Sequence, residues 1–135
     1  MIKQTFSAKI ESIPEVKSFI TSWLDSYGCP TKTKFQIYSA LDEIFSNIAN
    51  YGYGEKEGYV RIQLDCDEAT RMASITFIDN CEEFNPLEKE DPDLMLSEDD
   101  RPIGGLGIFL VKQMMDNVTY QRINNCNILT IFKQI

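Results

Sequence analysis

Residues 41–53, with the sequence LDEIFSNIANYGY, decide the fold prediction. Residues 41–51 form the second half of a stretch over residues 30–51 whose apolar side chains recur at helical spacing and occupy one side of a helix. Glu43 and Asn47 are four residues apart, so both lie on the opposite, polar side. Gly52 ends the pattern. The segment predicts a long amphipathic helix with two polar side chains next to each other on its free face.

The flanking segments predict an α+β architecture. An earlier helix starts with Ser12 as its N-cap and Pro14 in its first turn, and it ends at Gly28. Period-two alternation predicts the strands. The expected elements are a strand over 2–10, helices over 12–28 and 30–51, a hairpin of 60–67 and 73–79, a long loop over 80–103, a helix over 104–116, and a hairpin of 117–123 and 127–135. We expect one domain over residues 1–135, a two-layer α/β sandwich with helices on one face of a mixed sheet.

Composition excludes several classes of function. Hydrophobic residues make up 43% of the 135 positions and charged residues 25%, as in globular domains. The formal net charge of −8 argues against direct binding to nucleic acid or to an anionic membrane, because both require a positive field. The sequence contains no histidine, which excludes Ser-His-Asp catalysis and histidine-ligated metals. A P-loop motif is also absent, so nucleotide chemistry would have to use carboxylates, amides, glycines and a metal.

The cysteines and the N-terminal residues indicate in which cellular compartment the protein is expected. Cys29, Cys66, Cys81 and Cys126 form no C-x-x-C pair, so we expect reduced thiols and no zinc site. The first residues lack the apolar core of a signal peptide, and no apolar run approaches the roughly 18 residues of a membrane span. We expect a cytoplasmic protein.

The pair Glu43 and Asn47 is suited to metal-assisted proton transfer. The amide oxygen of Asn47 can ligate Mg²⁺, which prefers oxygen donors and keeps several waters. The carboxylate of Glu43 can accept a proton from an attacking hydroxyl. For this pair alone, the alternative is a solvated helix face.

Asp79 ends an otherwise apolar strand. A carboxylate at this position could accept a hydrogen bond from a buried donor such as an adenine amino group. The alternative is a turn-forming aspartate before Asn80.

A glycine-rich stretch opens the last expected helix with Gly104, Gly105, Leu106 and Gly107. Glycines allow the backbone to approach a phosphate closely, and a helix N-terminus supplies free N–H groups and a positive dipole. The alternative is a flexible exit from the preceding loop.

Together these features resemble the GHKL ATPase superfamily, which contains gyrase and the histidine kinases. Within it, the chain is most similar to the anti-sigma-factor serine kinases. The matching stretches are LDEIFSNIANYGY at 41–53, FNPL at 84–87 and GGLGIFLV at 104–111. The resemblance covers nearly the whole chain and implies the Bergerat ATP-binding fold.

The resemblance implies a role for each matching residue, with ATP and Mg²⁺ as cofactors. Glu43 would be the general base and Asn47 the Mg²⁺ ligand. Asp79 would hold the adenine amino group. Gly105 and Gly107, within the glycine-rich stretch, would flank the phosphates.

Three further assignments follow from the same resemblance. Residues 88–103 would form the ATP lid, and Thr130 would support the adenine, often through water. Arg101, a lone cation near the end of the lid, could reach a phosphate. The alternative for Arg101 is a solvated loop charge.

The sequence departs from the family pattern at one position. The family has Asp-x-Gly, whereas this chain has Asp79, Asn80 and Cys81. Glycine permits close approach of the base or an unusual backbone angle, and cysteine adds a Cβ. We therefore expect Cys81 to reduce nucleotide affinity.

The resemblance implies an ATP-dependent serine protein kinase that acts as an anti-sigma regulatory factor. Its partners would be a sigma factor and an anti-anti-sigma protein of the STAS type, and family members are commonly homodimers. The rival hypothesis is a partner-switching binding module that uses ATP only as a structural ligand or not at all. Glu43 favours the kinase and Cys81 favours the module. A third hypothesis, a detached two-component catalytic domain, requires a histidine from another chain.

Overall fold

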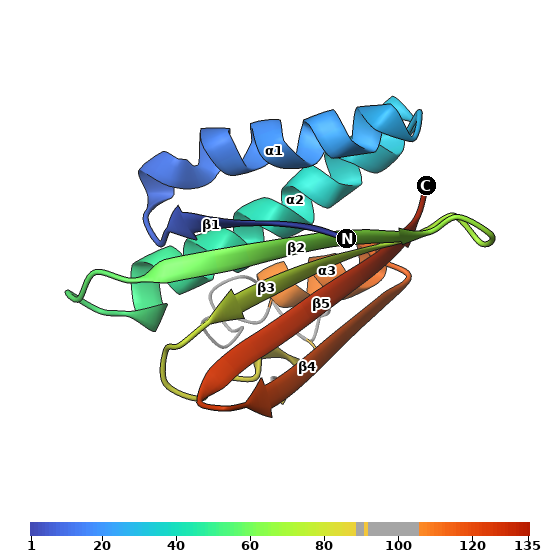
Figure 1. The fold of residues 1–135 in the computed structure, drawn as a ribbon. Helices are drawn as coiled ribbons and strands as arrows, with labels where there is room; N and C mark the ends of the chain where they lie inside the picture. The colour runs from blue at the N-terminus through green and yellow to red at the C-terminus, as the bar shows by residue number, and fades with distance from the viewer. Residues whose placement is uncertain (89–90, 92–105) are drawn as a thin grey trace.

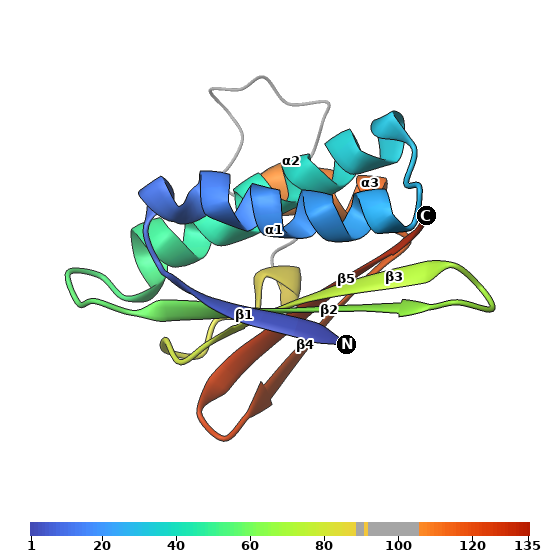
Figure 2. The same ribbon diagram turned by 45° about the horizontal axis from the view of Figure 1, so that its top comes forward.

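The computed structural model describes residues 1–88, 91 and 106–135. Within this part, three α-helices lie on one face of a five-stranded sheet (Figures 1 and 2). The helices are α1 (Ile13–Ser26), α2 (Thr31–Asn47) and α3 (Leu106–Met114), and the shorter segments are η1 (Ile10–Ser12), η2 (Ile48–Gly52) and η3 (Pro86–Glu88). The strands are β1 (Ile2–Ser7), β2 (Tyr59–Asp67), β3 (Met72–Asp79), β4 (Asn117–Ile123) and β5 (Cys126–Gln134). The expected two-layer α+β sandwich is confirmed.

The sheet has the strand order β1-β2-β3-β5-β4, and all four pairings are antiparallel. The expectation of a mixed sheet is therefore corrected for the described strands. Strands β3 and β4 run in the same direction, because each of them pairs antiparallel with β5. However, β5 lies between them, so they do not pair with each other. The first strand, β1, lies at one edge of the sheet.

The core lies between the helices and one face of the sheet. Helix α2 contributes Leu41, Ile44 and Phe45, which are almost completely buried. On the sheet side, alternate residues are buried along β2 and β3, including Ile62 and Phe77. Because the apolar stripe of α2 faces the sheet, Glu43 and Asn47 are turned out of the core, and both are only half-buried. Core packing thus determines which side of α2 is free to carry the site.

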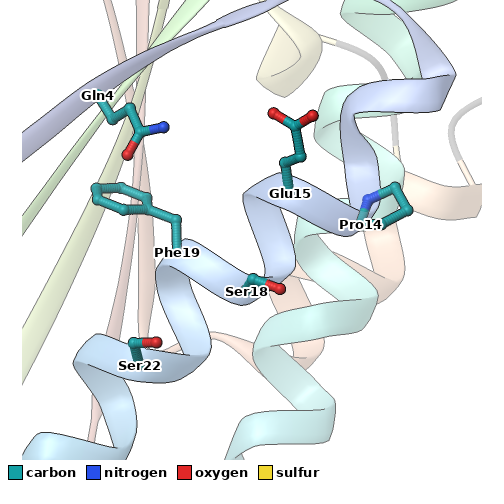
Figure 3. A pocket seen from close by; sticks show the side chains of 6 residues that line it. All are labelled: Gln4, Pro14, Glu15, Ser18, Phe19 and Ser22. Atoms are coloured by element: carbon teal, nitrogen blue, oxygen red, sulfur yellow. The ribbon is translucent and has the colours of Figure 1, made fainter.

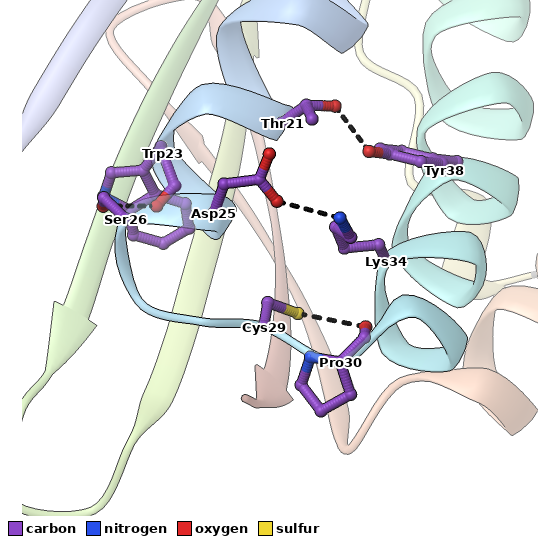
Figure 4. Close-up of polar contacts among 8 residues, drawn as sticks. All are labelled: Thr21, Trp23, Asp25, Ser26, Cys29, Pro30, Lys34 and Tyr38. Carbon is purple, nitrogen blue, oxygen red and sulfur yellow. Dashed lines mark hydrogen bonds and ion pairs between the residues drawn. The ribbon is translucent and has the colours of Figure 1, made fainter.

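Polar contacts hold α1 against α2 at the turn between them (Figure 4). The hydroxyls of Thr21 and Tyr38 are 2.5 Å apart, and Lys34 Nζ donates to Asp25 Oδ1 at 2.8 Å. The turn contains Gly28 with a φ of +68°, as expected for a residue that follows a helix end. These contacts hold α2 in place against α1.

The second expected helix, over 30–51, has two parts. Regular α-helix ends at Asn47, and the chain continues as a π-helical turn over Ile48–Gly52. A π turn changes the angle at which successive side chains project, and such turns are frequent at functional sites. The polar face that starts at Glu43 therefore continues toward Gly52 with altered geometry.

All four cysteines are free thiols, as expected. Cys29 and Cys81 are buried, and Cys66 and Cys126 are partly buried. Among the helices described, none is long and apolar enough to cross a membrane.

Candidate functional site

The first part of the site is on the free face of α2. Asn47 Nδ2 donates a hydrogen bond of 3.0 Å to Glu43 Oε1. This contact decides the orientation of the Asn47 amide, because the opposite orientation would bring its oxygen against the carboxylate. The amide oxygen Oδ1 therefore faces away from Glu43, and it is a hard oxygen donor of the kind that Mg²⁺ prefers.

Gly107, the second residue of α3, lies directly against the Glu43 carboxylate. A Cβ built at this glycine would overlap the carboxylate oxygens of Glu43. The absence of a side chain at Gly107 is thus what allows the first turn of α3 to approach α2 here. The structure brings Glu43, Asn47 and Gly107 together, although Gly107 is 60 or more positions away in the sequence.

Several expected residues lie outside the described part of the chain. These are Arg101, Gly104, Gly105 and nearly all of the expected lid over 88–103. Leu106, the first residue of α3, is described and is 41% exposed. Of the glycine-rich stretch, Leu106 and Gly107 can therefore be related to the rest of the site.

The second part of the site is at the end of β3. Asp79 is only 4% exposed. Its Oδ1 accepts hydrogen bonds from Asn127 Nδ2 at 2.9 Å and from the backbone N–H of Cys81 at 3.0 Å. A buried carboxylate requires such donors, because burial without them is costly. Asp79 therefore does form the expected turn contact, but it is also part of a buried polar network.

Cys81 is 8% exposed and fills space next to Asp79. A Cβ built at Gly52 would lie 2.7 Å from Cys81 Sγ, so the thiol packs against the backbone of η2. Burial raises the pKa of the Cys81 thiol to about 12, and the nearby Asp79 carboxylate adds to this rise. The thiol is therefore protonated at neutral pH and is a poor nucleophile.

The backbone at position 81 does not require glycine. Among the described residues other than glycine, positive φ values occur at Arg71, Asn124 and Asn125 only, so Cys81 has an ordinary backbone angle. If cysteine at position 81 lowers nucleotide affinity, as the sequence predicts, the cause is the space that it takes beside Asp79 and not backbone strain.

Tyr53 and Gly52 connect the two parts of the site. The Tyr53 hydroxyl lies 2.7 Å from the Tyr59 carbonyl oxygen and accepts from the backbone N–H of Asn80 at 3.1 Å. Burial raises the pKa of Tyr53 to about 12, so its hydroxyl stays protonated. The end of the α2–η2 segment is thus held against the turn that follows Asp79.

Thr130 is not part of this arrangement, which corrects the expectation for it. Successive residues of a strand point to opposite faces of the sheet. In β5 the buried residues are Asn127, Leu129 and Ile131, so Thr130 lies on the face away from the helices. There its hydroxyl is 3.0 Å from that of Thr76. Thr130 and Asp79 are therefore on different sides of the sheet.

Asn127 is the residue that the sequence interpretation missed. It pairs with Asp79 in the register of β3 and β5, and its amide contacts the carboxylate. The only sequence signal was a polar residue at a position where the alternation of β5 predicts burial. Its partner could not be identified without knowing the register of the two strands.

One surface hollow lies elsewhere. Its volume is about 510 Å³, and Figure 3 shows that it is formed by β1 and α1. The lining residues are Gln4, Pro14, Glu15, Ser18, Phe19 and Ser22, and none of them is an expected site residue. Since they present no converging cluster of charged groups, we place the site at the polar cluster on α2, α3 and β3 and not at this hollow.

The comparison with protein families agrees with this geometry. Residues 6–133 match the histidine kinase-like ATPase domain. The chain belongs to this family. The family implies ATP as the ligand of the site, and the residues described above are the ones available to hold it.

Individual proteins are also similar to this chain, in sequence or in fold. The serine/threonine-protein kinase BtrW of Bordetella bronchiseptica is 28% identical over 100 residues, which is 74% of this chain and 70% of BtrW. The RsbU and RsbW domains of a Mycobacterium tuberculosis protein superpose with a TM-score of 0.63 at 14% identity, covering 99% of this chain and 32% of that one. The histidine kinase domain of a blue-light activated kinase from Erythrobacter litoralis gives 0.57 at 16% identity, covering 78% of this chain and 46% of that one. This chain thus spans about a third and about half of those two structures, which support the fold alone.

The donors on α2 fit a magnesium nucleotide. Asn47 offers one outward amide oxygen, and the Glu43 carboxylate beside it holds the amide in that orientation. This is the donor set expected when Mg²⁺ is bound through one or two protein oxygens together with phosphates and water.

Proposed function

We propose that this protein is an ATP-dependent serine protein kinase that acts as an anti-sigma regulatory factor. It would bind a sigma factor and phosphorylate an anti-anti-sigma protein of the STAS type. The observation that carries the proposal is the contact between the Glu43 carboxylate, the Asn47 amide and Gly107. Membership of the ATPase family and similarity to a kinase, BtrW, support it.

The nucleobase would bind at the end of β3. Asp79 would accept a hydrogen bond from the adenine amino group, because a carboxylate is the strongest acceptor for such a donor. Its burial strengthens the interaction, since bulk water competes less for the carboxylate. Thr130 would not contact the base, because it is on the other face of the sheet.

The phosphates would bind between α2 and the start of α3. Asn47 Oδ1 would ligate the metal, and the N–H groups from Gly104 to Gly107 would face the phosphates. Arg101 would add a positive charge. The helix α3 begins at Leu106, so its positive end points into this region.

Glu43 would act as the general base. When bound, Mg·ATP supplies the terminal phosphoryl group for transfer. The carboxylate of Glu43 takes the proton from the serine hydroxyl of the partner while the serine oxygen forms its bond to phosphorus and the bond to ADP breaks. The hydrogen bond from Asn47 Nδ2 to Glu43 Oε1 fixes the carboxylate in one orientation, which leaves Oε2 for the proton.

The second candidate is a partner-switching binding module without catalysis. It is favoured by Cys81, whose thiol occupies space next to the Asp79 carboxylate. A pure binding module does not need the base Glu43. The two candidates differ in one measurable property, the transfer of phosphate to a partner.

The deciding experiment combines transfer with capture. The protein is incubated with labelled Mg·ATP and candidate anti-anti-sigma proteins, and capture of sigma factors is measured in parallel. Label on a partner serine supports the kinase. Sigma-factor capture without label on any partner supports the binding module. Sedimentation of the free protein tests the homodimer that is common in the family.

Replacing Cys81 with Gly is expected to tighten ATP binding and to lower stability. Removal of the thiol opens room beside Asp79, which should increase affinity. The buried thiol and the rigidity of a non-glycine residue are lost, which costs about 1–2 kcal/mol of unfolding free energy. Calorimetric titration and thermal unfolding measure the two effects. Equal or weaker ATP affinity would show that the site is adapted to cysteine.

Replacing Gly107 with Ala is expected to slow phosphoryl transfer by up to about 10²-fold, the effect of displacing a catalytic group by about 1 Å. The new methyl group would overlap the Glu43 carboxylate, which must move. The fold should survive, because the displaced atoms are the end of a flexible side chain and Ala favours helix over Gly by about 1 kcal/mol. Single-turnover transfer and thermal unfolding check this. A transfer rate equal to that of the parent would mean that the position of Glu43 is not critical.

A further inference from the structure

Asn127 is a 6% exposed amide whose hydrogen-bonding capacity is fully used by the protein. Its Nδ2 donates to Asp79 Oδ1 and to the Glu82 carbonyl oxygen, both at 2.9 Å. Its Oδ1 accepts from the Phe84 backbone N–H at 3.2 Å and from the Tyr120 hydroxyl at 2.5 Å. An asparagine side chain has two donor and two acceptor positions. Asn127 therefore has no position left for a ligand, and any role that it has in binding must be exerted through its partners.

The orientation of this amide is determined by its neighbours. The Glu82 carbonyl can only accept and the Phe84 N–H can only donate. Turning the amide over would place oxygen against oxygen on one side and N–H against N–H on the other. The Tyr120 hydroxyl must then donate to Oδ1, and burial raises the pKa of Tyr120 further above neutrality, so the proton stays on the hydroxyl.

This orientation fixes the role of one oxygen of Asp79. Oδ1 receives two donors, Asn127 Nδ2 and the backbone N–H of Cys81. The carbonyl of Cys81 is held in turn by Arg122 Nη1 at 2.8 Å. Oδ1 is thus committed to the protein as an acceptor, and among the described residues no hydrogen bond from an amide or N–H group reaches Oδ2. The Cys81 thiol, a weak donor, also hydrogen-bonds to this carboxylate. Oδ2 is the oxygen that no N–H donor of the described residues holds, and it is the one that the amino group of a ligand would reach.

We propose that Asn127 is a positioning residue that gives the nucleobase site its preference for a 6-amino over a 6-oxo purine. The inference rests on the proposed function, in which Asp79 contacts the base. By holding Oδ1, Asn127 prevents the carboxylate from turning, so that Oδ2 stays at the place where the base would bind. A carboxylate oxygen can only accept a hydrogen bond. A 6-amino group donates to such an oxygen, whereas a 6-oxo group would place an acceptor against it and leave both groups unpaired.

The preference can be tested with ATP and ITP, which differ in the amino or oxo group at position 6 of the purine. We expect Asn127→Ala to weaken ATP binding by about tenfold, the scale of one hydrogen bond to a charged group. ITP binding should change much less, so the ratio of the ITP and ATP dissociation constants falls by a similar factor. Partial unfolding would weaken both nucleotides equally, so this ratio separates positioning from a structural role.

Thr130→Ala is the matched control, because it alters the same strand three residues further on but on the opposite face. It should leave both dissociation constants unchanged. Tyr120→Phe keeps the ring and removes one donor to Asn127. It should lower the ratio of the ITP and ATP dissociation constants less than Asn127→Ala does. It provides the test if Asn127→Ala does not fold.

The outcomes separate this inference from the proposed function. If Asn127→Ala folds and its ratio of the ITP and ATP dissociation constants is unchanged, the role of Asn127 is overturned. If Asn127→Ala does not fold, an unchanged ratio in Tyr120→Phe overturns it. If Asp79→Ala binds ATP as the parent does, or if the parent binds no nucleotide, the nucleobase site itself is wrong. Loss of selectivity in Asn127→Ala together with parental behaviour of Thr130→Ala supports the proposal.

Discussion

Replacing Glu43 with Gln is expected to slow phosphoryl transfer to a partner serine by about 10²–10⁴-fold, the usual contribution of a general base. Affinity for Mg·ATP should change little, because Asn47 and not Glu43 is proposed as the metal ligand. Some transfer should remain, since phosphoryl transfer also depends on the metal and on backbone positioning.

The contacts of Glu43 explain why this substitution isolates the chemistry. Gln has nearly the size of Glu, so its contact with Gly107 can be kept. Its carbonyl oxygen can still accept the hydrogen bond from Asn47 Nδ2. The change removes the ability to take a proton and leaves the surrounding packing in place.

The measurement pairs a nucleotide titration with single-turnover transfer. Asp42→Asn is the matched control, because it makes the same chemical change one residue earlier, where the carboxylate forms an ion pair with Lys17. The control should transfer phosphate at about the parental rate. If Glu43→Gln also does so, Glu43 is not the base and the kinase mechanism is wrong.

Replacing Asp79 with Ala is expected to weaken ATP binding by about tenfold to hundredfold, because the base loses a charged acceptor worth roughly 1.5–3 kcal/mol. The substitution also leaves the Asn127 amide and the Cys81 N–H without their acceptor. The loss of partners for buried donors costs about 1–3 kcal/mol of unfolding free energy. Both effects have the same origin, the burial of this carboxylate.

Calorimetric titration at a temperature where every variant is folded measures the affinity. Asp65→Ala serves as the control, because Asp65 is an exposed carboxylate on the neighbouring strand β2. It should bind ATP as the parent does. Parental affinity in Asp79→Ala would place the nucleotide pocket elsewhere in the fold.

The sequence alone was sufficient to predict most of the fold and one half of the candidate site. Helical periodicity predicted the helices, and alternation predicted both hairpins. In the turn of the second hairpin, φ is positive at Asn124 and Asn125. The four-residue spacing of Glu43 and Asn47 predicted that they lie side by side, and their side chains do form a hydrogen bond. These are properties of single elements, so local spacing determines them.

Only the tertiary structure decided how separate elements meet. The register of β3 and β5 brings Asn127 to Asp79. The alternation of β5 places Thr130 on the face opposite Asn127, but the alternation of a single strand does not specify which residue of β3 each of them meets. In the same way, only the packing of α3 on α2 shows that Gly107 leaves room for Glu43. Contacts between residues far apart in sequence depend on how the whole core packs, and no local pattern encodes that.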